Sequence, residues 1–156
     1  MTTAPTPTAR LLARVADWPG VTLRRDDTAV VVVEVGEATV GRLHPHGRLD
    51  VLVAAPFRQP LVHDGLATDA GAGADWVERS VQTAEDVVPA TRLLRLAYLY
   101  RRILRSPHAE ALDRIRAELD RRVMGDALRA AFEAVLEHRA RTFGPSHPPS
   151  ARSPSS

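Results

Sequence analysis

The segment that decides the fold is residues 21–53, which read VTLRRDDTAVVVVEVGEATVGRLHPHGRLDVLV. Its valine and threonine side chains are β-branched and favour extended strands. Three short polar stretches interrupt it, at residues 25–27, 36–37 and 44–47, and the last contains the Pro and Gly that suit a turn. The segment therefore predicts four strands, Val21–Arg25, Thr28–Val35, Ala38–Leu43 and Arg48–Val53, in an antiparallel meander.

Helical patterns flank this meander. Leu11, Leu12 and Val15 predict a short helix over 9–17 that ends at the Pro19-Gly20 turn signal. A second short helix is expected over 57–64, because Pro56 fits a first helical turn and Gly65 can end it. The Gly- and Ala-rich stretch 67–75 predicts a mobile loop before a fifth strand over 76–81.

The longest helix is predicted over 84–105. Thr83 precedes it with Asp86 three residues on, a variant of the capping box. Val87, Leu94 and Tyr98 recur on one face of this helix, so that face should pack on the sheet. Pro89 lies in its early turns and predicts a kink or a later start.

Residues 109–141 form a second amphipathic region, with a break at Gly125-Asp126 that predicts two helices. The sequence thus predicts an α+β class: about five antiparallel strands against a long helix, with a C-terminal helical extension. We expect disordered tails at 1–8 and 143–156 and an α+β domain at 9–107. The helices of 108–142 would pack on that domain or form a homodimer interface.

Composition excludes several kinds of chemistry. With 156 residues the chain suits one core, and the absence of Cys excludes disulfides and thiolate sites. No stretch is long enough to span a membrane and no N-terminal apolar segment is present, so a cytoplasmic protein is expected. All 21 basic residues are Arg, but 19 acids are interspersed with them, which argues against a nucleic-acid partner. Phosphate-loop, dinucleotide and nucleophile-elbow motifs are missing.

An ordered set of short motifs runs from residue 18 to residue 98. They are Trp18-Pro19-Gly20-Val21, Val40-Gly41-Arg42-Leu43-His44, Leu49-Asp50-Val51, Arg58 and Leu61 ahead of Gly65, Trp76-Val77, and Leu93-Leu94-Arg95-Leu96-Ala97-Tyr98. In this order and spacing the chain resembles the luciferase-domain family, which includes fungal luciferases and short bacterial proteins of unknown function. The resemblance covers roughly half of the chain, residues 18–98.

The resemblance implies an α+β fold and, as in the fungal members, oxygenation of a hydroxypyrone without an added cofactor. The family usually has His at the position of Arg42 as well as at His44, and another in the loop before the tryptophan. Here Arg42 and the stretch 68–72 lack these two histidines. Histidine is the side chain suited to moving protons near neutral pH.

Asp50 is the most unusual residue of the meander, because a carboxylate in an apolar strand must be paired or have a shifted pKa. Arg58 or Arg42 would be its partner, either in a structural salt bridge or facing a ligand. His44-Pro45-His46 with Asp50 or His63 has ligand types that suit a metal. A solvated hairpin tip is the simpler interpretation, and we expect no metal and no cofactor.

The resulting hypothesis is a protein that binds a small planar or anionic organic molecule between the sheet and the long helix. His44, Asp50 and Arg58 are its candidate catalytic residues, and Arg42, Trp76 and Tyr98 are candidate ligand contacts. In catalysis His44 would be the general base and Arg42 or Arg58 would hold an oxyanion. The alternative is a non-catalytic module for homodimerisation or protein binding through the C-terminal helices.

Overall fold

The computed structural model describes residues 4–69 and 75–143, and the fold is α+β, as the sequence predicts. In chain order the elements are α1 (Pro7–Ala16), β1 (Val21–Arg25), β2 (Val31–Val35), β3 (Ala38–Leu43), β4 (Arg48–Leu52), α2 (Ala55–His63), β5 (Trp76–Ser80), the 3₁₀ turn η1 (Ala84–Asp86), α3 (Val87–Arg105), α4 (Ala109–Asp120) and α5 (Asp126–Thr142). The chain divides into two compact units within α3, residues 1–101 and 102–156.

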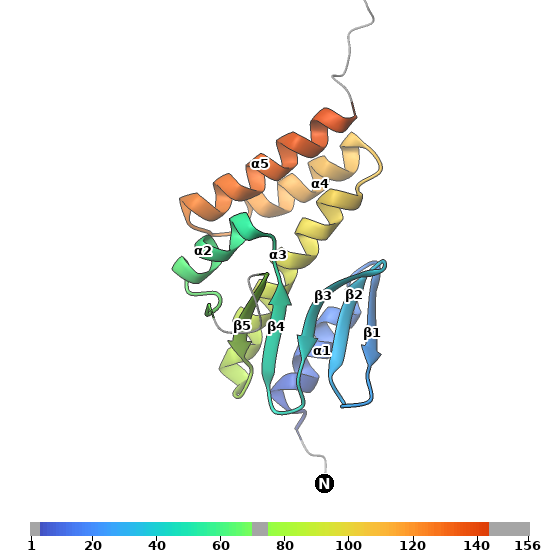
Figure 1. The fold of residues 1–156 in the computed structure, drawn as a ribbon, viewed down its shortest axis with the longest axis vertical. Helices are drawn as coiled ribbons and strands as arrows, with labels where there is room; N and C mark the ends of the chain where they lie inside the picture. Colours follow the sequence, from blue (N-terminus) through green and yellow to red (C-terminus); the bar gives the residue numbers. More distant parts are fainter. Residues whose placement is uncertain (1–3, 70–74, 144–156) are drawn as a thin grey trace, which may run out of the picture. The chain divides into compact units, whose positions relative to one another are not determined.

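The five strands form one antiparallel sheet in sequence order, β1-β2-β3-β4-β5, so the meander is confirmed (Figure 1). A register shift between Val33 and Glu34 interrupts the β2–β3 pairing. Residue 50 of β4 lies opposite residue 42 of β3 and residue 78 of β5. Residues that are opposite one another point to the same face, so this register decides which side chains meet.

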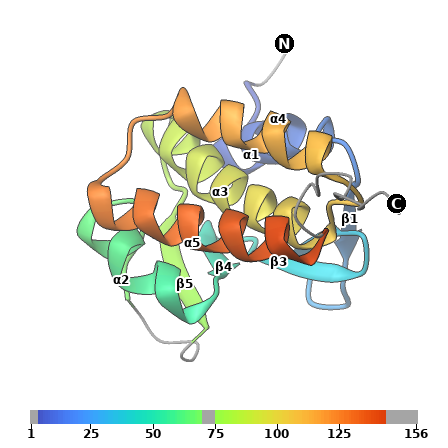
Figure 2. The same cartoon turned by 90° about the horizontal axis from the view of Figure 1, so that it is seen from above.

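One face of the sheet, here called the inner face, carries the core of the first unit. Leu49, Val51 and Val77 alternate along β4 and β5 and are 0% exposed. Figures 1 and 2 place α1 and the first turns of α3 on this face. A Cβ at Gly41 would lie 2.9 Å from Leu94 Cδ2, so the missing side chain lets α3 approach β3.

The helix α3 begins one turn later than a regular α-helix capped at Thr83 would. The capping box of Thr83 and Asp86 is present, but its first turn is the 3₁₀ turn η1 and the α-helix starts at Val87. Pro89 therefore falls in the first turn of α3, where its missing N–H costs no helical hydrogen bond. Of the two outcomes predicted from Pro89, a kink or a later start of the helix, the structure has the later start.

Two expected irregular stretches are more ordered than predicted. The helix α1 begins at Pro7, inside the expected tail 1–8, because Thr6 Oγ1 accepts from Ala9 N–H at 3.1 Å and Pro fits the first helical position. Thr68, in the expected mobile loop, forms an isolated bridge to Glu78 at the edge of β5. Residues 70–74 of that loop, and residues 1–3 and 144–156 of the expected tails, lie outside the described residues.

The strand β2 begins at Val31, three residues later than expected. The Asp26 carboxylate accepts from the backbone N–H groups of Thr28 and Val30, at 2.8 and 3.1 Å, and thereby forms a longer turn. These hydrogen bonds, that of the Thr28 side chain first, hold the pKa of Asp26 below its ordinary value.

The second unit contains the pair α4 and α5, as the break near Gly125 predicts. Their apolar stripes are buried within the single chain: Leu112, Ile115, Leu119, Leu128, Phe132 and Leu136 are at most 8% exposed. Arg116 joins the two helices by a 2.5 Å hydrogen bond to Glu133.

Among the described helices none is long and apolar enough to cross a membrane.

Candidate functional site

The opposite face of the sheet, here called the outer face, carries a polar row. Arg42, Asp50 and Glu78 are successive partners across β3, β4 and β5, so their side chains share this face. Trp76 also belongs to it, since it is two residues from Glu78 on the same strand. The inner face is filled by the packed core, so these residues do not lie between sheet and long helix, where the sequence hypothesis put the ligand.

The turn between β3 and β4 positions the histidines at one end of this row. His44 N–H donates to Arg48 O and Gly47 N–H to His44 O, both at 2.9 Å, which closes a tight turn. Gly47 has a φ of +96°, a conformation that glycine adopts without a steric penalty. Gln82 Nε2 donates to His46 O, and Val81 N–H to Gly47 O, both at 2.7 Å. The backbone of the tip is therefore anchored to the end of β5, while Pro45 and His46 are exposed to solvent, as expected of a hairpin tip.

Asp50 is the buried centre of the outer face. It is only 4% exposed, and its Oδ2 lies 2.8 Å from His44 Nε2. Arg48 Nε lies 3.3 Å from Oδ1, in an ion pair, and Oδ1 accepts no hydrogen bond from the described residues. The partners of Asp50 are thus His44 and Arg48, and not Arg58 or Arg42 as expected from the sequence. A buried carboxylate needs such partners, because its desolvation is costly.

The contacts of His44 Nε2 indicate its tautomer. Arg48 Nη2 is 3.0 Å from this nitrogen, but Nε2 cannot donate to Asp50 and accept from Arg48 at once. The carboxylate accepts only, so the 2.8 Å contact with Asp50 requires a proton on Nε2, and Arg48 Nη2 is then a neighbour of this nitrogen and not a donor to it. In a neutral ring with its proton on Nε2 the lone pair would lie on Nδ1, and this nitrogen has no hydrogen-bond partner among residues 4–69 and 75–143. A carboxylate that orients an imidazole in this way prepares the other nitrogen to accept a proton.

Arg42 and Trp76 form the second contact of the outer face. The guanidinium carbon of Arg42 lies 4.7 Å from the centroid of the Trp76 ring, within the range of a cation–π contact. Arg42 therefore reaches across β4 to β5. Stacking uses the face of the guanidinium and leaves its N–H groups, which lie in its plane, able to donate to an anion.

Two residues of the sequence hypothesis have other contacts. Arg58 on α2 pairs with Asp69, its Nε donating to Oδ1 at 2.6 Å. Tyr98 on α3 is 3% exposed and donates its hydroxyl to Pro19 O at 2.6 Å, beside the Trp18 ring. Tyr98 thus packs in the first unit's core on the inner face, away from His44 and Asp50. The hypothesis missed Arg48, although its position two residues before Asp50 puts both on the same face of a strand.

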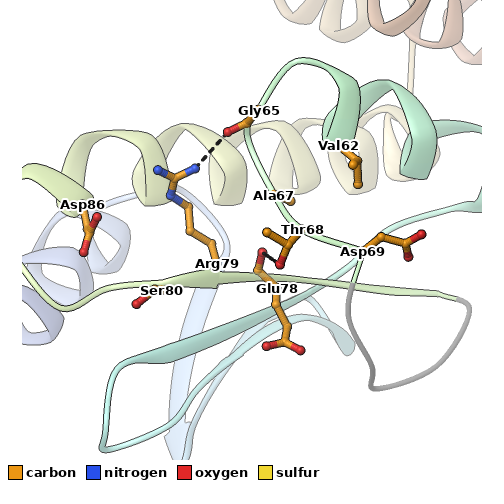
Figure 3. Close-up of a pocket in the computed structure, with 9 residues that line it drawn as sticks. All are labelled: Val62, Gly65, Ala67, Thr68, Asp69, Glu78, Arg79, Ser80 and Asp86. Atoms are coloured by element: carbon orange, nitrogen blue, oxygen red, sulfur yellow. Dashed lines mark hydrogen bonds between the residues drawn. The ribbon is translucent and has the colours of Figure 1, made fainter.

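A cleft of about 520 Å³ lies beside β5 (Figure 3), lined by Val62, Gly65, Ala67, Thr68, Asp69, Glu78, Arg79, Ser80 and Asp86. In this view Arg79 and Glu78 leave the strand in opposite directions, as alternation along β5 requires. Arg79 Nη1 donates to Gly65 O and Leu66 O, which ties the chain after α2 to the sheet. Asp86 accepts from the N–H groups of Gln82 and Thr83, and these bonds hold its pKa below the ordinary value. Arg79 and Asp86 thus stabilise the fold at this cleft.

The described part of the chain has no group of three or more His, Asp or Glu side chains placed to hold a metal ion. His44 and His46 are neighbours with ring centroids 5.6 Å apart, whereas the His63 ring nitrogen lies 3.7 Å from Asp64 on α2. In comparisons with known proteins, no protein-family model, curated protein or solved structure matches the chain significantly. The case for function therefore rests on the outer face.

Proposed function

We propose that the outer face binds a small planar organic acid and that His44 accepts a proton from it. The observation that carries the proposal is the pair of buried Asp50 and His44, 2.8 Å apart. Asp50 holds the imidazole through Nε2, and the side chain of His44 is 18% exposed, so part of the ring is open to a ligand. A positioned imidazole is the commonest general base in proteins.

The second support is the stacked pair of Arg42 and Trp76. A guanidinium fixed over a ring donates to a carboxylate or an enolate with little further loss of side-chain freedom. Negative charge that develops when the ligand loses its proton is stabilised by such a donor. Arg42 thus has the role of anion holder that the sequence hypothesis gave to Arg42 or Arg58.

The resemblance to the luciferase-domain family extends the proposal to the ligand and the reaction. Its fungal members act on a hydroxypyrone, a planar ring with an acidic hydroxyl, and removal of that proton is the step His44 would perform. We propose oxygenation without a cofactor as the reaction class. Oxygen uptake in the presence of the pyrone, measured with an oxygen electrode, tests this extension separately from binding.

Binding is tested with 4-hydroxy-6-methyl-2-pyrone and the full chain, followed by NMR of the histidine side chains. We expect the His44 ring signals to shift on titration. His44→Gln should weaken binding about tenfold or more, the loss of one strong hydrogen bond. His63→Gln is the matched control, since its side chain is 87% exposed on α2, and should bind as the parent does.

Asp50→Asn separates function from folding. The amide keeps the shape of the carboxylate but cannot enforce the Nε2–H tautomer, so we expect binding to fall about tenfold while stability changes by about 1 kcal/mol. Urea unfolding and the same NMR titration measure both quantities. Unchanged pyrone affinity in Asp50→Asn and His44→Gln would rule out the proposed role of the pair.

A further inference from the structure

Two charged side chains of the outer face have no ion pair within the described ranges 4–69 and 75–143. They are Arg42, which stacks on the Trp76 ring, and Glu78. Other charged side chains on the face are paired: Arg24 with Glu34 at 3.1 Å, and Asp50 with His44 and Arg48. Among the residues that the structure describes, the face therefore offers one positive and one negative group without an ion pair.

The geometry keeps these two groups apart but close enough to share one molecule. Arg42 and Glu78 are each opposite Asp50 in the register, so their backbones are two strand spacings, about 10 Å, apart. Asp50 lies between them but is 4% exposed and already paired. Trp76, on the same strand as Glu78, supplies an aromatic surface beside both charges.

A carboxylate directly opposite another carboxylate is unfavourable in a sheet, and Glu78 lies opposite Asp50. Arg48 compensates the charge of Asp50, which leaves Glu78 as the uncompensated charge among the described residues of this row. A ligand with a cationic group beside Glu78 would remove this repulsion. A ligand with a carboxylate alone would satisfy Arg42 and add a third negative group to the row.

From these observations we infer that the ligand is a zwitterion with a planar ring, its carboxylate held by Arg42 and its ammonium by Glu78. The inference rests on the proposed function, because it assigns the ligand class to the same face. Amino-substituted aromatic acids belong to this class. A polyanion does not, because its charges would meet Glu78 and Asp50 as well as Arg42.

The test compares three probes of one ring size on the full chain: benzoate, benzylamine and 4-(aminomethyl)benzoate. Isothermal calorimetry measures each affinity, and the His44 ring signals report binding near the site. We expect 4-(aminomethyl)benzoate to bind about tenfold more tightly than either single-charge probe, since each charge-assisted hydrogen bond adds to affinity. In Arg42→Gln, 4-(aminomethyl)benzoate should bind no more tightly than benzylamine. In Glu78→Gln, it should bind no more tightly than benzoate.

Arg25→Gln on β1 and Glu37→Gln in the β2–β3 turn are matched controls that remove the same charges elsewhere and should leave all three affinities unchanged. If benzoate binds as tightly as 4-(aminomethyl)benzoate and shifts the His44 signals, the zwitterion is overturned and the acid-binding function stands. If the advantage survives Arg42→Gln or Glu78→Gln, the assignment of the charges is wrong. If no probe binds and the pyrone also fails, both proposals are overturned.

Discussion

The two faces of the sheet bury different kinds of side chain: the inner face buries apolar residues, and the outer face buries a carboxylate. On β4, Leu49 and Val51 of the inner face are 0% exposed, and Asp50 between them, on the outer face, is 4% exposed. The leucine and valine are covered by apolar side chains and gain free energy from leaving water. Asp50 is paired instead with two polar side chains, His44 and Arg48.

The difference teaches where the fold gains stability and where it fixes geometry. An apolar core tolerates exchange among side chains of similar volume. A buried carboxylate contributes little net stability, but it fixes the orientation of every group that pairs with it. The inner face therefore determines that the chain folds, and the outer face determines how His44 is held.

The largest effect expected is at the inner face. Leu49→Ala removes a side chain that is 0% exposed, and we expect it to cost about 3 kcal/mol of unfolding free energy. Leu52→Ala, three residues on and on the outer face, removes a half-buried leucine and should cost about 1 kcal/mol. Urea unfolding of both variants measures the contrast. If both variants lost the same unfolding free energy, the inner face would not be the main source of stability.

A smaller effect is expected at the turn that carries the histidines. A Cβ at Gly47 would lie 2.7 Å from both Gln82 Nε2 and Val81 O, and its φ of +96° adds backbone strain. Gly47→Ala should therefore lower the free energy of unfolding by about 2 kcal/mol and shift the NMR signals of the His44 ring. Gly65→Ala is the control, because it has a positive φ of 76° but no atom within 4 Å of a Cβ, and it should leave those signals in place.

The contrast between the faces also explains what the sequence could predict. Strands and core helices follow from β-branched runs and helical periodicity, so the meander and α3 were predicted with few errors of boundary. The side of the sheet was missed because Asp50 was judged by its residue type alone. Leu49 and Val51 on either side of Asp50 point the opposite way in any strand, so the alternation already assigned Asp50 to the other face.

The partners of Asp50 show a second limit. Arg48 and His44 are near Asp50 in the sequence, whereas the expected Arg58 lies on α2 and pairs with Asp69. Arg48 was overlooked because many arginines of the chain are exposed and no pattern marks one as a partner. The burial of Asp50, and therefore its need for two partners, depends on the tertiary register of β3 and β4.

The smallest effect tests whether the two faces are coupled through Asp86. Its carboxylate caps the start of α3 on the inner face and holds Gln82, whose side chain reaches the histidine turn. Asp86→Asn should cost about 1 kcal/mol, the usual loss of a helix cap. Because the pKa of Asp86 is lowered on folding, this contribution is present above the ordinary value of 3.8 and is lost as the pH falls through the folded value.

The stability difference between parent and Asp86→Asn should therefore be constant from pH 7 to about 5 and should shrink as the pH falls below 3.8, as measured by thermal unfolding. The His44 ring signals should move less than in Gly47→Ala, because the Gln82 side chain still bonds His46 O. A shift as large as that of Gly47→Ala would mean that the cap of α3 also fixes the outer-face site. The faces would then be one cooperative unit joined at residues 82–86, and not two surfaces with separate roles.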